Sequence, residues 1–222
     1  MRSKNLPWQR ATPDTPSGEV TVYIVEDDPA TADLVRAVAK SMATRSREYT
    51  SAHAFLRDCG SLRPGCLVLE LVMPDLDGLA LQRELRSRGV TLPIVFVTAR
   101  ADVASAVRAM REGAVDFLQK PVTPAVLAES LARALDAERN NRAIHASQAA
   151  IRRKLDSLTR REREVLDQIN CGVPSKIIAM NLKIGTRSVE LHRSHLMEKM
   201  GAASVAHLIR MLALIGDLSR TS

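Results

Sequence analysis

The sequence has few aromatic residues and few cysteines. Phe, Trp and Tyr make up 3% of its 222 residues, against 45% hydrophobic residues in all, so aliphatic side chains must form its cores. Its cysteines, Cys59, Cys66 and Cys171, are odd in number and match no metal-ligand spacing, which predicts reduced, mostly buried thiols in a cytoplasmic protein. No apolar run approaches the length of a membrane span, and residues 1–19 lack the apolar stretch of a signal peptide.

Charge is distributed unevenly along the chain. A length of 222 residues favours two small domains over one large one. Residues 20–135 contain 14 Lys/Arg and 14 Asp/Glu, whereas residues 151–222 contain 13 and 7. A basic C-terminal part beside a neutral N-terminal part indicates a polyanionic partner for the C-terminal part alone. A basic surface that is merely solvated would have the same composition.

Short apolar runs alternate with amphipathic stretches in the N-terminal part. The runs lie at 20–25, 66–71, 93–97 and 115–118, with a weaker one at 47–50. The amphipathic stretches lie near 29–43, 78–88, 102–112 and 123–138. Strands alternating with helices predict an α/β domain whose parallel sheet is covered on both faces.

Polar residues follow these runs, at the point where each predicted strand ends. They are Glu26-Asp27-Asp28 after the first run, Glu70 after the second, Thr98 after the third and Lys120 after the fourth. In an open parallel sheet, ligands bind outside the carboxyl ends of the strands. We therefore expect carboxylates, a hydroxyl and an ammonium to share one shallow pocket that can hold a divalent cation and a phosphoryl group.

Residues 123–158 contain no strand pattern and predict a long helix, with or without a break in its polar middle. Ile144, Ile151, Leu155 and Leu158 recur at spacings of seven, four and three. A paired-helix dimer contact would suit this spacing, but there are too few heptads to predict one.

The remaining residues have a purely helical pattern. A capping box, Thr159-Arg160-Arg161-Glu162, opens a helix that runs to Asn170. Further helices are predicted from Pro174-Ser175, from a Thr186 cap to Met200 with Gly201 as the stop, and over 204–215. Two short helices at an angle, the second of them basic and exposed, are typical of a helix-turn-helix.

With these motifs in order, the chain resembles a two-component response regulator of the LuxR/FixJ/NarL type. The receiver motifs are Val25-Glu26-Asp27-Asp28, Met73-Pro74-Asp75-Leu76-Asp77-Gly78, Thr98 and Lys120-Pro121. The DNA-binding motifs are Leu158–Leu166, Lys176-Ile177-Ile178-Ala179 and Val189-Glu190-Leu191-His192-Arg193. The resemblance implies a flexible tail (1–18), a flavodoxin-like receiver with a parallel five-stranded sheet (19–138), a helical linker (139–155) and a four-helix LuxR-type helix-turn-helix domain (156–222).

The resemblance also assigns roles at the receiver pocket. Glu26, Asp27, Glu70 and the carbonyl of Val72 correspond to Mg²⁺ ligands, Thr98 and Lys120 to phosphoryl contacts, and Phe117 to the aromatic residue that rotates in the switch. The departure is Glu70, because the family has at this position the Asp that accepts phosphate from a partner sensor histidine kinase.

Glu70 leaves three interpretations open. Because Glu is one methylene longer, it moves the attacking oxygen by about 1 Å, which can slow a reaction by roughly 10²-fold. Its charge also mimics a phosphoryl group in part. The receiver is therefore independent of phosphorylation and close to its active state, or weakly phosphorylated or gated in another way, or altered deliberately from Asp. Binding of Mg²⁺ at this site would be weakened or altered by Glu70.

For the basic part, the resemblance implies a recognition helix in the major groove of double-stranded promoter DNA. Val189, Leu196 and Met200 are expected to pack inward. The expected DNA contacts are base edges for Glu190, Leu191 and Ser194, and phosphates for Lys176, Arg187, Arg193 and Lys199. Thr186 is expected to bind DNA as well. Leu208, Met211 and Leu212 of the last helix are expected to form a homodimer contact or the core of the domain itself.

The function predicted is a DNA-binding transcription regulator of a two-component phosphorelay. The alternative is a signalling adaptor whose pseudo-receiver acts mainly by protein–protein contact. An enzyme is not expected, because no nucleophile–base pair or catalytic metal cluster is recognisable.

Overall fold

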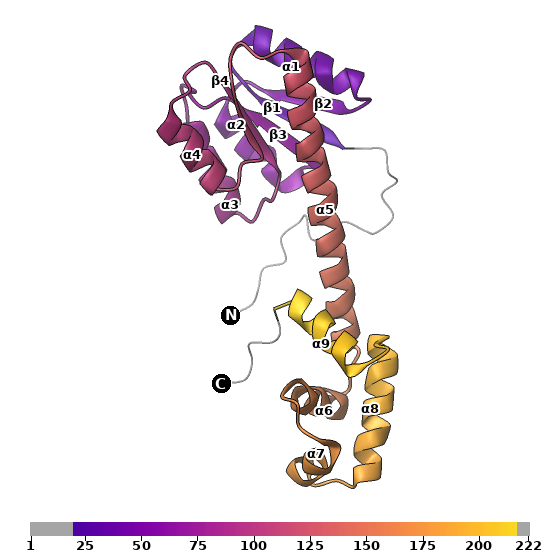
Figure 1. Ribbon diagram of the computed structural model, residues 1–222. Coiled ribbons are helices and arrows are strands. Elements are labelled where there is room, and N and C mark those ends of the chain that lie inside the picture. The colour runs from indigo at the N-terminus through magenta and orange to yellow at the C-terminus, as the bar shows by residue number, and fades with distance from the viewer. Residues whose placement is uncertain (1–19, 217–222) are drawn as a thin grey trace. The chain divides into compact units, whose positions relative to one another are not determined.

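The computed structural model describes residues 20–216, which divide into two compact units on either side of Arg142 (Figure 1). The tail predicted at 1–18 lies outside the described residues. Among the described residues, no helix is both long enough and apolar enough to cross a membrane.

The first unit contains a five-stranded sheet in which all pairs are parallel. Its strands are β1 (Thr21–Val25), β2 (Arg45–Tyr49), β3 (Gly65–Leu69), β4 (Ile94–Thr98) and β5 (Asp116–Gln119). Their order is β2-β1-β3-β4-β5, so the chain winds in opposite directions from β1. The predicted α/β fold with a parallel sheet is confirmed, including the weak strand β2, which lies at an edge.

Helices cover both faces of this sheet. They are α1 (Pro29–Ser41), α2 (Ala52–Asp58), α3 (Gly78–Ser87), α4 (Val103–Arg111) and the first part of α5 (Pro124–Asp156). Side chains of α2, α3 and α4 share one core with Tyr23 and Phe96, and side chains of α1 and α5 share the other with Ile24 and Val68. Burial on both faces explains why the strands are continuous apolar runs.

The helix α5 is unbroken over 33 residues. Its first turns bury Leu127 and Leu131 in the core of the first unit, and its last turns bury Ile151 and Leu155 in the core of the second. Between them, residues 139–149 are mostly exposed. The polar middle therefore needs no break, since a helix can continue through solvent.

The second unit is helical. After the end of α5 it contains α6 (Arg160–Asn170), α7 (Ser175–Leu182), α8 (Thr186–Met200) and α9 (Val205–Leu214). The capping box is confirmed, because the Thr159 hydroxyl accepts from Glu162 N and the Glu162 carboxylate accepts from Thr159 N. Gly201 ends α8 at φ 63°, as predicted.

Two predictions for this unit need correction or completion. Thr186 does not cap α8: the N-cap is Gly185, which has no side chain to bond, and Thr186 is the first helical residue. On α9, Leu208, Met211 and Leu212 lie in the core of the unit, with at most 8% of each exposed. They therefore serve the core of the domain.

Candidate functional site

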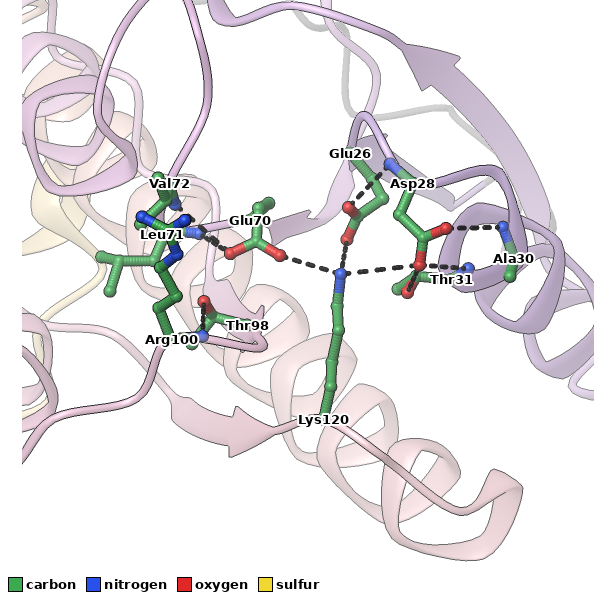
Figure 2. A network of polar contacts seen from close by, with 10 residues as sticks. All are labelled: Glu26, Asp28, Ala30, Thr31, Glu70, Leu71, Val72, Thr98, Arg100 and Lys120. Carbon is green, nitrogen blue, oxygen red and sulfur yellow. Dashed lines mark hydrogen bonds and ion pairs between the residues drawn. The ribbon is translucent and has the colours of Figure 1, made fainter.

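The carboxyl ends of the strands bring Glu26, Glu70 and Lys120 together (Figure 2). Glu26 directly follows β1, Glu70 follows β3 and Lys120 follows β5. Both carboxylates are buried, with 4% of Glu26 and 6% of Glu70 exposed. The strand order places β1 and β3 side by side, which explains how residues distant in sequence meet here.

The ammonium of Lys120 bridges the two buried carboxylates. Its Nζ lies 2.9 Å from Oε2 of Glu26 and 2.8 Å from Oε2 of Glu70. A third carboxylate, that of Asp28, is 3.9 Å away. One cation thus bridges two buried anions, and short charge-assisted hydrogen bonds hold all three in place.

Backbone amides bind the other oxygen of each carboxylate. Oε1 of Glu26 accepts from Asp28 N at 3.1 Å. Oε1 of Glu70 turns back on its own chain and accepts from Leu71 N at 2.7 Å and from Val72 N at 3.3 Å. Every carboxylate oxygen of Glu26 and Glu70 therefore has a donor from the chain itself.

Burial and pairing shift the protonation equilibria here in ways that can be traced. Burial raises the pKa of Glu26, and its hydrogen bonds with Lys120 and Asp28 N offset this only in part. Burial alone would lower the pKa of Lys120, but its hydrogen bonds to Glu70 and Glu26 outweigh that effect and raise it. Lys120 stays charged as a result.

Asp28 has a structural role that the sequence interpretation did not assign. Its carboxylate caps α1 by accepting from Ala30 N, Thr31 N and the Thr31 hydroxyl. These hydrogen bonds, that with Thr31 first, lower its pKa. An Asp directly before a Pro at the start of a helix is a recognisable cap signal.

A hollow of about 340 Å³ opens beside Glu70. Its lining residues are Asp27, Glu70, Val72, Met73, Pro74, Ala99 and Arg100. The predicted site residues Asp27 and Val72 thus share a pocket with Glu70, whereas Arg100 was not predicted. Thr98 is fully buried, and its hydroxyl accepts from Arg100 N at 3.1 Å, which holds the loop after β4 beside the pocket (Figure 2).

Close packing fixes the backbone at Glu70. A Cβ on Gly78, the first residue of α3, would lie 2.5 Å from the Glu70 carbonyl oxygen and 3.1 Å from a ring atom of Phe96. Only glycine allows this approach. The Phe117 ring lies 5.8 Å from the Phe96 ring between centroids and is partly buried against the same core.

As arranged here, the carboxylates of Glu26 and Glu70 are not free to bind a divalent cation. The oxygens of Glu26 and Glu70 are engaged by Lys120 and by amides, and across residues 20–216 no three His, Cys, Asp or Glu side chains are grouped to hold a metal ion. Carboxylate oxygens would have to exchange these donors for the ion. The positive charge at this point comes from Lys120.

In the second unit, α8 presents the predicted division into two faces. Val189, Leu196 and Met200 are fully buried. Thr186, Arg187, Glu190, Leu191 and Ser194 are exposed, with 55% of Leu191 accessible to solvent. An exposed apolar side chain among charged and polar ones suits contact with a base edge.

The predicted phosphate-binding residues differ in their surroundings. Lys176 and Arg187 are exposed and form no side-chain hydrogen bond or ion pair within the described residues. Arg193 donates to the Ser175 hydroxyl at 3.3 Å. Lys199 donates to Glu162 Oε2 at 2.7 Å, so its ammonium already has a buried anionic partner.

Family models match both parts of the chain. Residues 22–132 match the response regulator receiver domain, and residues 156–212 match the bacterial regulatory proteins of the luxR family. The chain is 38% identical to the transcriptional regulatory protein FixJ of Rhizobium meliloti, over 89% of this chain and 97% of that protein. The chain belongs to the two-component response regulators. It is a DNA-binding member of that family of transcription regulators.

Other response regulators are similar over comparable lengths. The tetrathionate response regulatory protein TtrR of Salmonella typhimurium is 37% identical, over 86% of this chain and 90% of its own. Among solved structures, the response regulator StyR matches with a TM-score of 0.73 at 33% identity, covering 88% of this chain and 98% of StyR. Full-length FixJ from B. japonicum matches with a TM-score of 0.55 at 32% identity, covering 91% and 99%.

Proposed function

We propose that this response regulator regulates transcription without phosphorylation of its receiver, because Glu70 occupies the position of the phosphate-accepting Asp. The observation that carries the proposal is the Lys120 bridge: Nζ lies 2.8 Å from Glu70 and 2.9 Å from Glu26. Family resemblance gives Lys120 the task of neutralising a phosphoryl group. Here the carboxylate of Glu70, which is part of the chain, already binds the Lys120 ammonium.

The proposal extends to the other residues of the receiver site. Glu26, Asp27, Glu70 and the Val72 carbonyl would be the Mg²⁺ ligands, and Thr98, Phe117 and Lys120 the switch residues. Since both carboxylates are saturated by donors from the chain, Mg²⁺ binding is weakened relative to an Asp-containing receiver. Lys120 competes with the ion for the same oxygens.

A phosphorylation assay tests this proposal. The full-length chain and Glu70→Asp are incubated with a small phosphodonor and Mg²⁺, and incorporated phosphate is measured over time. Glu70→Asp should be labelled about 10²-fold faster, because an attacking oxygen misplaced by about 1 Å costs that much. Equal, robust labelling of both chains would contradict the proposal. Glu70→Gln serves as the unlabelled control.

We further propose that α8 reads the major groove and that the chain binds an inverted repeat as a homodimer. Glu190, Leu191 and Ser194 would contact bases, while Lys176, Thr186, Arg187 and Arg193 would contact the DNA backbone. Lys199 is the weakest member of the predicted set, since a phosphate contact would have to break its bond to Glu162. A cytoplasmic location and the absence of enzymatic activity belong to the same proposal.

Gel-shift measurements distinguish base contacts from phosphate contacts. Arg187→Ala should weaken binding to all DNA and lower the salt slope by about one, because it removes one phosphate contact. Glu190→Ala should relax the preference at one base pair. Equal, unselective losses from both variants would contradict the assignment of α8. If the full chain enriches no DNA sequence from a random pool, that result would favour the adaptor alternative.

The domain limits stay part of the proposal. The receiver is proposed to end near 138, as predicted. Because Ile151 and Leu155 are buried in the core of the second unit, we propose that the DNA-binding domain begins within α5 and includes the last turns of the predicted 139–155 linker.

A further inference from the structure

The C-terminal ends of α5 and α8 lie close together in the second unit, and a lysine side chain from each contacts a backbone carbonyl at the end of the other. Lys154, in the last turn of α5, donates from Nζ to the carbonyl of Met200, the last residue of α8, at 2.8 Å. Lys199, in the last turn of α8, lies 3.5 Å from the carbonyl of Ser157, directly after α5, and makes its shorter bond, 2.7 Å, to Glu162 Oε2. We call this exchange of Lys154 and Lys199 the lysine clamp.

Electrostatics explains why two helix ends of this kind need cations. The last carbonyls of a helix have no partner within it, and the aligned peptide dipoles make this end partially negative. Two such ends repel each other unless positive groups lie between them. A third cation contributes here, because Arg163 of α6 donates to the carbonyl of Leu155 at 2.6 Å.

The surroundings fix the position of Lys154. Its neighbours Ile151 and Leu155 are about 95% buried in the core, with 5% and 6% exposed. Gly201 ends α8 at φ 63°, and a Cβ there would lie only 3.0 Å from Lys154 Nζ. The ammonium thus packs closely against Gly201 at the end of α8.

We propose that Lys154 is a positioning residue for DNA recognition, which sets the angle of α8 by fixing its C-terminal end to α5. Leu191 lies nine residues before Met200, or about 14 Å along the helix. A tilt of about 4° at the clamp would move Leu191 and its neighbour Glu190 by about 1 Å, which is enough to spoil a hydrogen bond between Glu190 and a base edge. This inference rests on the proposed role of α8, but Lys154 itself is engaged at Met200 and contacts no base.

The test measures binding to two DNA duplexes. One is the duplex that the full-length chain selects from a random-sequence pool, and the other is its scrambled form. Lys154→Met should weaken binding to the selected duplex about fivefold to tenfold more than to the scrambled one, because a tilted α8 weakens contacts to base edges and only the selected duplex offers the matching bases. The salt slope should not change. Lys154→Arg, which keeps a charged donor, should restore most of the preference.

Arg152→Met is the matched control. It removes one positive charge from the same helix, where its side chain is exposed and has no hydrogen bond or ion pair within the described part of the chain. It should weaken binding to both duplexes equally and slightly. If Lys154→Met behaves like this control, or has no effect, the inference is wrong. If Glu190→Ala also leaves the preference unchanged, the role of α8 fails as well.

Hydrogen exchange gives a readout that does not involve DNA. Amides of Leu196–Gly201 should exchange faster in Lys154→Met, while those of α6 keep their protection. Unchanged exchange at the end of α8 would overturn the inference. If Lys154→Met proves unfolded at the assay temperature, Lys154→Gln replaces it in both measurements, and a selective loss relative to Lys154→Arg remains the required result.

Discussion

At the scale of single residues, the receiver site depends on one ammonium between two buried carboxylates. Removal of one partner from a buried ion pair leaves an uncompensated charge, which destabilises more than the pair itself stabilises. Lys120 differs in this from the surface cations, whose ion pairs are exposed and contribute little.

Lys120→Met is therefore expected to destabilise the receiver by about 3 kcal/mol, because Glu26 and Glu70 would remain buried and charged without a cation. Denaturant unfolding measures this loss. Lys40→Met, which removes an exposed cation of α1, should stay within about 0.5 kcal/mol of the parent. A loss from Lys120→Met no larger than that of the control would show that the bridge does not form in solution.

Gly78→Ala should disturb the receiver through the backbone. The added Cβ would meet the Glu70 carbonyl oxygen at 2.5 Å, so α3 must shift, at a cost of about 1–3 kcal/mol. In Gly60→Ala, the new Cβ has nothing within 4 Å, and stability should hardly change. Thermal unfolding of both variants decides the point, and similar midpoints would contradict the close approach.

The sequence predicts the members of this site better than their contacts. Strand-end polar residues identified Glu26, Glu70 and Lys120, because parallel strands end at a common edge. The spacing of these residues does not predict which side chains form ion pairs. It also does not predict that the Glu70 carboxylate accepts from the amides of the two residues that follow it. Arg100 was not predicted because it lines the pocket from a loop, and hydrophobic periodicity predicts nothing about loop residues.

At the scale of helices and strands, local signals predicted long elements and missed a short one. The helix α2 has seven residues, two turns, which is too short for a clear apolar period. Ser51, whose hydroxyl accepts from Ala54 N, was the available signal. At α8, Thr186 has the right residue type for a cap, but Gly185 occupies the N-cap position one residue earlier.

The end of α7 offers a stabilising substitution. Lys183 caps it at φ 54° and ψ 45°, a left-handed conformation that costs a side-chain-bearing residue about 1 kcal/mol. Lys183→Gly should raise the free energy of unfolding by about 0.5–1 kcal/mol. The reverse change at a similar position, Gly172→Ala at φ 71°, should lower it by a comparable amount. Chemical denaturation checks both, and a loss in Lys183→Gly would contradict the strain.

Glu138 makes the stability of α5 and its receiver dependent on pH. Burial raises its pKa to about 7, against a weaker lowering by Arg142. The folded chain thus binds more protons than the unfolded chain between pH 4.5 and about 7, so stability falls as pH rises through this range.

Glu138→Gln should consequently be more stable than the parent above pH 7, by roughly 1–3 kcal/mol, and equal to it below about pH 4.5. Unfolding measured from pH 4 to pH 9 tests this. Glu129→Gln, on the exposed side of α5, is the control, and its free energy of unfolding should stay within about 0.5 kcal/mol of the parent. A constant difference between Glu138→Gln and the parent across the range would refute the assignment.

At the scale of the whole molecule, the chain has separate cores in its two units. The cores of the first unit and the core of the second share no buried residue. Scanning calorimetry should accordingly resolve two unfolding transitions.

Variants in each unit should shift only one of these transitions. Lys120→Met should lower one midpoint by about 10 °C. Glu162→Ala, which removes both the capping box and the partner of Lys199, should lower the other by several degrees. The pKa of Glu162 is lowered to about 2, chiefly by its hydrogen bond with Lys199. The midpoint temperature of the second transition should therefore also fall as pH falls from 4.5 toward 2. A single transition shifted by both variants would contradict this independence.

The Lys120 bridge has a consequence for how such a regulator is controlled in a cell. If the receiver acts without phosphorylation, as proposed, it gains little from Mg²⁺ or from a donated phosphoryl group. On the proposed function, the quantity of protein then sets transcript levels, rather than its chemical state. Gene dosage, translation and proteolytic turnover become the steps at which a signal would act.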